Sequence, residues 1–295
     1  MNDNLRGAAF MAASMAGFAV EDLFLKQAAQ HMPIGQVTLM VGLCGVVVFS
    51  LMALRKGEAP VPAAFLHRAL VIRSVFEVAG RLFYSLAIAL TPLSTTSAIL
   101  QATPLVVVAS AALLFREKVG WRRWSAVIIG FVGVLIILRP GLDGFSLLSL
   151  LALAGMAGFA GRDLATRAAP KVLSNRQLGV AGFTMLGLSG AITLMISGGA
   201  RVPDPAGLAF VGLTAVFATL GYHGLTSAMR TGEISFVTPF RYTRLVFALI
   251  LAVLFLGERP DSFTLIGSAS IVGSGLYALL RGNRKAQAKA PENRA

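Results

Sequence analysis

The sequence predicts an all-α membrane protein whose ten transmembrane helices form two inverted five-helix repeats. Three observations carry this prediction. Hydrophobic residues make up 56% of the 295-residue chain, and charged residues only 13%. Apolar runs of about twenty residues recur along the chain, which is the length that a helix needs to cross a lipid bilayer. The stretch MAGFAVEDL at residues 15–23 returns as MAGFAGRDL at residues 156–164, 141 positions later.

The composition excludes an ordinary soluble domain. Such a domain has about 25% charged residues because its surface faces water, and this chain lacks the polar residues to cover a globule. A single cysteine, Cys44, lies in an apolar run, so no disulfide can form within the chain. We expect Cys44 to be a small packing residue.

Charged residues, Pro and Gly separate the apolar runs and set the edges of each predicted helix. Pro33 precedes the second run, Arg55 and Lys56 follow it, and Pro92 precedes the fourth. The connections are short, so no soluble domain is inserted. In chain order the predicted spans are 6–27, 34–54, 68–90, 94–115, 121–138, 145–167, 177–197, 206–229, 235–256 and 262–280.

The distribution of Lys and Arg sets the orientation of these spans. Seventeen of these residues fall at the chain ends and in the loops on one side, and four fall on the other. Positive loops stay in the cytoplasm, so both termini are predicted to be cytoplasmic. The basic residues are dispersed over every loop on that side. They therefore account for the net charge of +13 through topology and headgroup attraction rather than through nucleic-acid binding.

The first span is predicted to be retained rather than cleaved as a signal peptide. Glu21 and Asp22 interrupt its apolar run, and no small-residue cleavage motif follows. Its near-copy in the sixth span cannot be a signal sequence at all.

The 141-residue offset holds far beyond the opening motif. It pairs Gln36 with Gln177 and Ser94 with Ser235 without a gap. Chance similarity between apolar segments would not keep such polar residues in register. Because each copy has an odd number of spans, the second enters the membrane from the opposite side, as in transporters that hold their substrate between inverted repeats. The predicted units are residues 1–140 and 141–281, followed by a basic tail at 282–295.

A family resemblance rests on two long segments. The segment LSTTSAILQATPLVVVASAALLFREKVGWRRWSAVIIGFVGVLIILRPG and its partner ISFVTPFRYTRLVFALILAVLFLGERPDSFTLIGSASIVGSGLYALLRG each combine a fourth helix ending in FREK or LGER with a Gly-spotted fifth helix. They resemble the paired EamA domains of the drug/metabolite transporter superfamily, and within it the bacterial aromatic amino-acid exporters. The resemblance implies a multi-pass protein of the bacterial inner membrane. Pro104 is a departure, because its repeat partner is Leu245; any kink that it causes is therefore expected in one half only.

Charged residues inside predicted spans need a reason, because each costs at least ~2.5–3.5 kcal/mol to insert. Asp22 and Lys26 stand four residues apart near the end of the first span, and Asp163 and Arg167 repeat this spacing in the sixth. We expect structural ion pairs at the interface, with a gate or a cation site as the alternative. Glu21 is likewise expected at the interface.

The third, eighth and ninth spans carry the predicted substrate site. Glu77 and Arg81 lie four residues apart near the middle of the third span and are expected to pair beside a cavity. Of Arg241 and Arg244, one is expected to face the cavity and the other the interface, and an arginine there suits a substrate carboxylate. The predicted substrate-binding residues are Phe18, Glu77, Arg81, Tyr84, Gln101, Phe159, Tyr222, His223, Tyr242 and Arg244.

These residues favour a secondary transporter that exports small amphipathic metabolites by alternating access. By resemblance the cargo would be amino acids, including aromatic ones; the alternative is another cargo such as drugs. No nucleotide-binding motif is present, and no cofactor, metal or catalytic residue is predicted. A membrane-embedded enzyme and a scaffold are the other classes, and three His offer little for metal hydrolysis. Because both halves are present in one chain, the duplication allows a working monomer, and the sequence leaves the oligomeric state open.

The predicted topology can be tested with a reporter that is fluorescent only in the cytoplasm. Fusions at the amino end and at the carboxyl end should both be fluorescent, because ten spans return the chain to the side where it began. A fusion in the loop at residues 198–204 should be dark. Opposite signals from the two ends would refute the inverted repeat.

Overall fold

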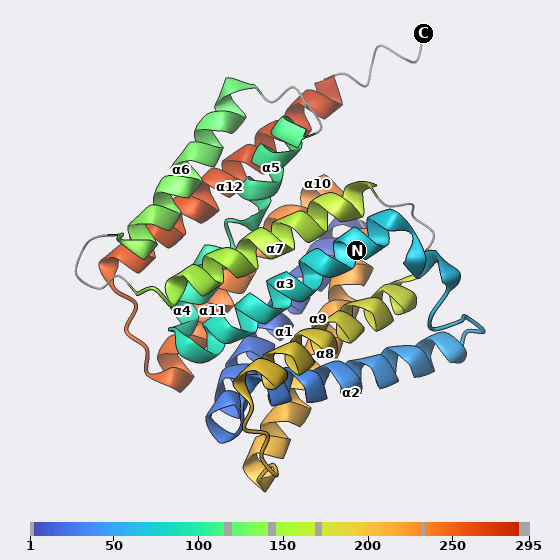
Figure 1. Cartoon of the computed structure of the whole chain (residues 1–295). Helices are drawn as coiled ribbons and strands as arrows, with labels where there is room; N and C mark the ends of the chain where they lie inside the picture. Colours follow the sequence, from blue (N-terminus) through green and yellow to red (C-terminus); the bar gives the residue numbers. More distant parts are fainter. Residues whose placement is uncertain (1–2, 115–119, 141–145, 169–172, 232–233, 289–295) are drawn as a thin grey trace.

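The computed structural model describes residues 3–114, 120–140, 146–168, 173–231 and 234–288 (Figure 1). These residues form helices, and no strand occurs among them. The elements of the first half are α1 (Asp3–His31), α2 (Ile34–Leu54), η1 (Ala63–Leu66), α3 (Arg68–Leu90), α4 (Leu93–Leu100), α5 (Thr103–Leu114) and α6 (Trp121–Leu138). Those of the second half are α7 (Ser149–Ala168), α8 (Asn175–Ser197), α9 (Pro205–Thr231), α10 (Ile234–Val237), η2 (Thr238–Tyr242), α11 (Thr243–Leu256) and α12 (Ser262–Ala288).

Local sequence explains where several of these helices begin. Pro33 and Pro92 precede α2 and α4, where a missing N–H costs nothing. Ser174 and Gln177 form a reciprocal capping box at the start of α8. Asp204 precedes α9, and its Oδ1 accepts the backbone N–H of Gly207 at 2.9 Å. This bond holds the pKa of the Asp204 carboxyl below its usual value.

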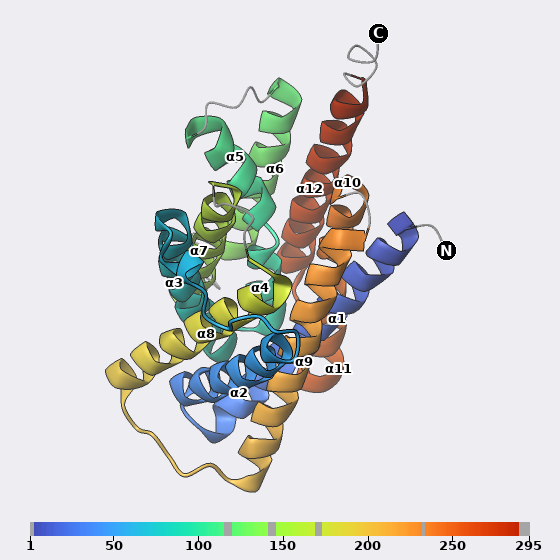
Figure 2. The same cartoon turned by 90° about the vertical axis from the view of Figure 1, so that its right-hand side faces the viewer.

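Helices of one half pack mainly on helices of the other. α1 packs on α9, α2 on α8, α3 on α7, α6 on α12 and α4 on α11. Exchanging the two halves converts the α1–α9 contact into the α7–α3 contact and leaves the α2–α8 and α6–α12 contacts unchanged. Figures 1 and 2 show α2 beside α8 and α6 beside α12 in both views. The packing therefore has the pseudo-twofold symmetry that a duplicated sequence predicts.

Glycine contacts show that this symmetry holds at the level of residues. Gly17 of α1 lies against Gly221 of α9, and Gly158 of α7 lies against Gly80 of α3. Adding 141 to Gly17 gives Gly158, and subtracting 141 from Gly221 gives Gly80, so the two contacts are copies of each other. Small residues at these crossings let the helix backbones approach closely.

The two copies of the second predicted span run antiparallel. Gly35, at the start of α2, meets Leu194 near the end of α8, whereas Phe49, near the end of α2, meets Gly179 near the start of α8. A helix that lies antiparallel to its own copy crosses in the opposite direction. This is the arrangement that an inverted repeat predicts.

The fourth and ninth predicted spans are both broken, and the breaks fall at equivalent places. The first break separates α4 from α5 at Gln101 and Ala102, and the second lies where η2 ends at Tyr242 and α11 begins at Thr243. Pro104 lies in the first turn of α5. Because its repeat partner is Leu245, the sequence predicted a kink in the first half only. The second half breaks without a proline at that position, because Thr238–Tyr242 forms a 3₁₀ turn that holds Pro239.

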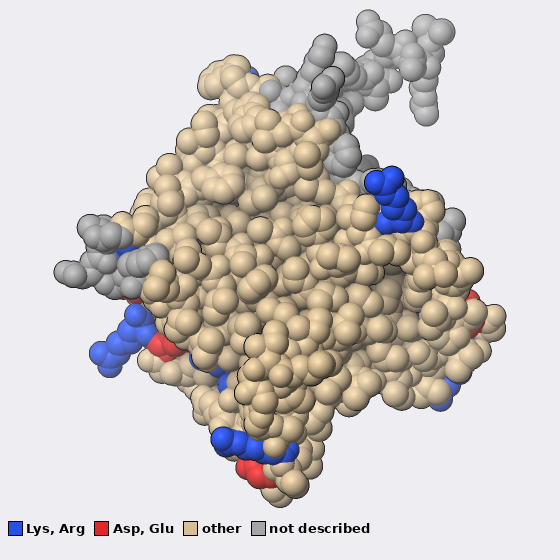
Figure 3. All heavy atoms as spheres, in the orientation of Figure 1, with Lys and Arg blue, Asp and Glu red and all other residues tan. Residues whose placement is uncertain are grey.

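Six of the described helical segments are long and apolar enough to cross a membrane. They are Asp3–His31, Ile34–Leu54, Leu93–Leu114, Asn175–Ser197, Pro205–Met229 and Thr238–Leu256. Trp124–Leu138 and Ser262–Ala278 are shorter apolar helices. α3 and α7 do not join them, and both carry buried or half-buried charges. The face of the molecule in Figure 3 is nearly free of charge except near its edges. The findings support a multi-pass membrane protein; the count of ten spans stays a prediction.

The α2–α8 crossing gives a test of this packing. A Cβ at Gly42 would come within 2.4 Å of the Gly187 backbone, so Gly42→Ala forces the helices apart. We expect a loss of about 1–3 kcal/mol, seen as a lower melting temperature of the purified protein in detergent. Gly212→Ala is the matched control, because nothing lies within 4 Å of its Cβ. The control should be neutral or stabilised by up to about 1 kcal/mol. Equal melting temperatures for the two variants would contradict the close crossing.

Candidate functional site

A cavity of about 820 Å³, including its opening, lies between the two halves and is called the seam cavity below. Its walls come from α1, α3, the α4–α5 break, α7, α9 and the η2–α11 break. The sixteen residues that line it are Met15, Phe18, Glu21, Arg81, Tyr84, Leu100, Gln101, Thr103, Pro104, Phe159, Arg162, Tyr222, Leu225, Arg241, Tyr242 and Arg244.

The lining residues fall into repeat-matched pairs. Fourteen of the sixteen form seven pairs separated by 141 positions, and only Met15 and Pro104 lie in the cavity without their counterparts. The seven pairs are Phe18 with Phe159, Glu21 with Arg162, Arg81 with Tyr222, Tyr84 with Leu225, Leu100 with Arg241, Gln101 with Tyr242 and Thr103 with Arg244. The cavity therefore lies on the pseudo-twofold axis. Only the phenylalanine pair keeps the same residue type on both sides.

One polar cluster, the Asp22 cluster, joins Asp22 of α1, Tyr84 of α3 and Arg244 of α11. Arg244 Nη2 donates to Asp22 Oδ2 at 2.7 Å, and the Tyr84 hydroxyl donates to the same oxygen at 3.0 Å. The Asp22 side chain is 2% exposed, so these charge-assisted bonds replace the water that it has lost. The Arg244 guanidinium also lies 5.2 Å from the centre of the Phe18 ring. The cluster ties the two halves together at the cavity wall, which Tyr84 and Arg244 line.

The predicted partner of Asp22 was Lys26, and the structure differs on this point. Lys26 Nζ donates instead to the carbonyl oxygens of Ile88 and Thr91, at 3.0 Å and 2.5 Å. These carbonyls lie at the end of α3, where the last carbonyl groups have no partner within the helix. Lys26 therefore caps α3, while Asp22 bonds Tyr84 and Arg244, which line the cavity. The side chain of Arg167, the predicted partner of Asp163, lies outside the part of the chain that the structure describes.

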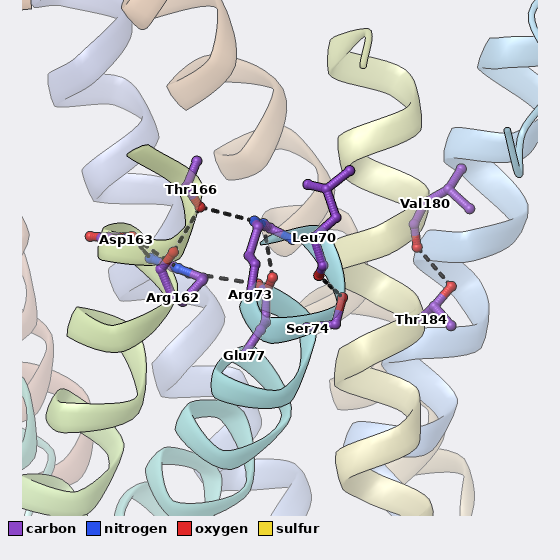
Figure 4. A network of polar contacts seen from close by, with 9 residues as sticks. All are labelled: Leu70, Arg73, Ser74, Glu77, Arg162, Asp163, Thr166, Val180 and Thr184. Carbon is purple, nitrogen blue, oxygen red and sulfur yellow. Dashed lines mark hydrogen bonds and ion pairs between the residues drawn. The ribbon is translucent and has the colours of Figure 1, made fainter. Parts of the chain in front are cut away.

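A second polar cluster, the Glu77 cluster, connects α3 and α7 (Figure 4). Arg73 Nη2 lies 2.8 Å from Glu77 Oε2, and Arg73 Nε donates to Thr166 Oγ1 at 3.1 Å. Arg162 Nη1 lies 3.6 Å from Glu77 Oε1, and Arg162 donates from Nε and Nη2 to Asp163 Oδ1 at 3.0 Å and 2.8 Å. Glu77 is 1% exposed and does not line the cavity. Glu77 therefore contacts the Arg162 guanidinium from outside the cavity lining.

The predicted pair of Glu77 with Arg81 does not form. Arg73 lies four residues before Glu77, Arg81 four residues after it, and the structure uses the earlier arginine. Arg81 instead lies 4.0 Å from Glu21 Oε1. Glu21 itself is 5% exposed and lines the cavity rather than the interface. The equal spacing on both sides of Glu77 was the signal that could have revealed Arg73.

The aromatic residues of the predicted site lie largely where they were expected. Phe18, Phe159 and Tyr222 line the cavity, and Tyr222 packs edge-on against Phe49 at 5.4 Å. Arg162 lies 4.9 Å from the centre of the Phe159 ring. Cationic groups over aromatic faces stabilise each other in a dry site. Two arginine–aromatic contacts, at Phe18 and Phe159, therefore face each other across the axis.

Three other predicted residues have different outcomes. Gln101 lines the cavity, and its Nε2 donates to the carbonyl oxygen of Arg241 at 3.1 Å, so the two helix breaks touch. Tyr242 lines the cavity, but its hydroxyl packs against Gly275 of α12. His223 is exposed and does not belong to the cavity lining, because it lies about 100° around α9 from Tyr222. The structure therefore does not bring His223 together with the other predicted residues in the cavity.

A metal site finds no support in the described residues. No group of three or more His, Cys, Asp or Glu among them is arranged to hold a metal ion. The carboxylates around the cavity are held by arginines, which are counter-charges rather than co-ligands. The chemistry that the site offers is binding of a polar or charged aromatic molecule.

Comparison with known proteins gives the family context. The model of the EamA-like transporter family matches residues 5–139 and again 145–280. A riboflavin transporter of Rhizobium johnstonii is 26% identical over 208 residues, covering 70% of this chain and 68% of the relative. An S-adenosylmethionine uptake transporter of Rickettsia bellii is 24% identical over 224 residues, covering 74% of each. These names do not include amino-acid export, so that finer resemblance stays a prediction.

A solved crystal structure shares the fold. It has a TM-score of 0.62 and 18% sequence identity, and the match covers 91% of this chain and 98% of that one. At this identity the likeness concerns the fold alone.

The Glu77 cluster yields a stability prediction. Glu77→Gln leaves Arg73 and Arg162 without their shared counter-charge, and breaking a buried pair costs about 3–5 kcal/mol. The melting temperature in detergent should fall by several degrees. Glu58→Gln is the control, because Glu58 also pairs with an arginine, Arg176, but its side chain is 26% exposed; exposed pairs contribute about 0–1 kcal/mol. An equal effect of both substitutions would mean that burial does not set the strength of the Glu77 contacts.

Proposed function

The chain belongs to the EamA-like transporter family of the drug/metabolite transporter superfamily, and we propose that it is a secondary carrier of small ring-containing metabolites. The cargo occupies the seam cavity and crosses by alternating access. The proposal places the carrier in a bacterial inner membrane with both termini in the cytoplasm. Residues 1–140 and 141–281 act as its two units.

The observation that carries this proposal is the pairing of the cavity residues. Fourteen of the sixteen lining residues form repeat-matched pairs, so the cavity sits where the two halves meet on their axis. Inverted repeats can exchange conformations, and such an exchange opens a site on the axis first to one side and then to the other. A site within one half, away from the axis, would not be opened to the two sides in turn by this exchange.

The cavity walls indicate the class of cargo. Phe18, Tyr84, Phe159 and Tyr222 supply ring faces and edges, and arginines lie among them. Aromatic side chains bind planar rings by stacked and edge contacts, and guanidinium groups bind polar substituents. Aromatic amino acids fit this description, in line with the predicted export of amino acids. Riboflavin and S-adenosylmethionine also contain a fused heteroaromatic ring, and the names of the relatives favour cargo of that kind as the second candidate.

The helix breaks provide the moving parts. Gln101 of one break donates to the Arg241 carbonyl of the other, so cargo bound between them contacts both halves. Backbone at a break is not held by a continuous helical ladder, so it can change its dihedral angles at low cost. We propose that α4 with α5, and η2 with α11, bend at these points. The energy comes from concentration gradients, of the cargo itself or of a coupling ion, and not from ATP.

Counterflow in proteoliposomes tests the function without assuming a direction. Vesicles preloaded with unlabelled phenylalanine, riboflavin or S-adenosylmethionine should take up the labelled form of at least one of them faster than empty vesicles. Phe159→Ala removes a cavity ring and should raise the KM about 2- to 10-fold, since an aromatic contact contributes about 0.5–1.5 kcal/mol.

Phe131→Ala is the matched control for Phe159→Ala. Phe131 lies on an exposed face of α6, outside the cavity lining, and its loss should leave the KM unchanged. Equal effects of the two substitutions on the KM would show that the Phe159 ring does not contact the cargo. Wild-type vesicles that exchange none of the three compounds would refute the proposed cargo class.

A further inference from the structure

Buried and half-buried charges around the seam cavity do not balance. The described side chains include five guanidinium groups and four carboxylates in or directly behind the cavity lining. They are Arg73, Arg81, Arg162, Arg241 and Arg244, with Glu21, Asp22, Glu77 and Asp163.

Four of the five arginines have a carboxylate of their own. Arg244 lies 2.7 Å from Asp22, and Arg73 lies 2.8 Å from Glu77. Arg162 lies 2.8 Å from Asp163, and Arg81 lies 4.0 Å from Glu21. Each of the four carboxylates therefore already pairs with one of these arginines.

Arg241 is the exception. Among the described residues, no carboxylate oxygen lies within 4.0 Å of its guanidinium, and the side chain makes no hydrogen bond to another described side chain. Asp163 is the acid with the strongest electrostatic effect on it, but Asp163 Oδ1 already accepts two N–H groups from Arg162. A guanidinium at membrane depth without a counter-charge is costly.

The backbone of Arg241 is nevertheless fixed. Its carbonyl accepts a hydrogen bond from Gln101, in the break of the opposite half, so the residue sits where the two breaks meet. Its repeat partner is Leu100, which lines the facing wall of the cavity. At this pair of positions the positive charge is therefore present on one side of the axis only, and Arg241 lines the same cavity as Phe18 and Phe159.

We propose that Arg241 binds the anionic group of the cargo, a carboxylate or a phosphate, while the ring of the cargo lies against the aromatic wall. This inference rests on the proposed function and narrows it to anion-bearing aromatic metabolites. The anionic group of the cargo then supplies the counter-charge that Arg241 lacks among the described residues. In the empty site no described carboxylate pairs with the Arg241 guanidinium.

The first test compares matched ligands that differ in the anionic group. The pairs are phenylalanine with phenylalanine amide, and flavin mononucleotide with riboflavin, each titrated onto purified protein in lipid nanodiscs. Wild type should bind the anionic member of at least one pair more tightly. Arg241→Gln should lower the affinity for that member roughly 10- to 100-fold, the strength of a bidentate charged bond. Affinity for the member that lacks the anionic group should not fall, and Arg241→Lys should restore part of the preference.

An unchanged preference in Arg241→Gln would overturn the inference while leaving the transporter function intact. If Arg241→Gln removed only a stabilisation by free chloride and left the ligand preference unchanged, Arg241 would bind an inorganic ion. That result would also overturn the inference.

A second test needs no cargo and separates this inference from the proposed function. In cargo-free, chloride-free buffer, Arg241→Gln should melt at or above the wild-type temperature, because it removes an uncompensated charge. Arg244→Gln strips Asp22 of its partner and should melt several degrees lower. If Arg241→Gln melted as low as Arg244→Gln, Arg241 would have an internal partner. The inference would then fall, whether or not any of the four ligands binds.

Discussion

Buried carboxylates that find their arginines in the opposite half hold this structure together at its centre. Asp22 of α1 bonds Arg244 of α11, and Glu77 of α3 faces Arg162 of α7. Lipid offers no counter-charge and no hydrogen bonds, so each buried acid needs an arginine, and for Asp22 the arginine that pairs with it among the described residues comes from the opposite half. The requirement to pair these charges fixes how α1, α3, α7 and α11 approach one another, and with that the shape of the cavity among them.

The positions of the helices follow the sequence duplication more closely than the residue types do. The Gly17–Gly221 contact is repeated as Gly158–Gly80, and the cavity lining follows the same offset almost throughout. Yet Glu21 is matched by Arg162, and Leu100 by Arg241. Close packing tolerates few changes in volume at a helix crossing, whereas a cavity wall can change its chemistry freely. The cavity is therefore symmetric in the positions of its lining residues and asymmetric in their chemistry.

Much of the fold could be predicted because hydropathy and the repeat are properties of local sequence. Helices occur in the apolar runs, although the fourth and ninth runs are broken, and the offset matched Phe18 with Phe159 and Arg81 with Tyr222, all four of which line the cavity. Pairing partners were harder. Glu77 has an arginine four residues away on either side, and only the rotation of α3 against α7 decides between them. Lys26 caps a helix that is distant in sequence, and His223 and Tyr222 differ by one position but face different surroundings. These contacts depend on tertiary packing, which the spacing of residues along the sequence does not determine.

The divergence of the lining has a consequence for the ancestry of the chain. A homodimer of the first unit alone would place Glu21 where Arg162 now stands and Thr103 where Arg244 stands. Asp22 would then lose its cation, and Glu77 would meet a second acid in place of an arginine. Two identical halves could still match their glycine crossings, but their electrostatics would drive them apart. The two halves are therefore no longer electrostatically interchangeable, although their helix crossings still match.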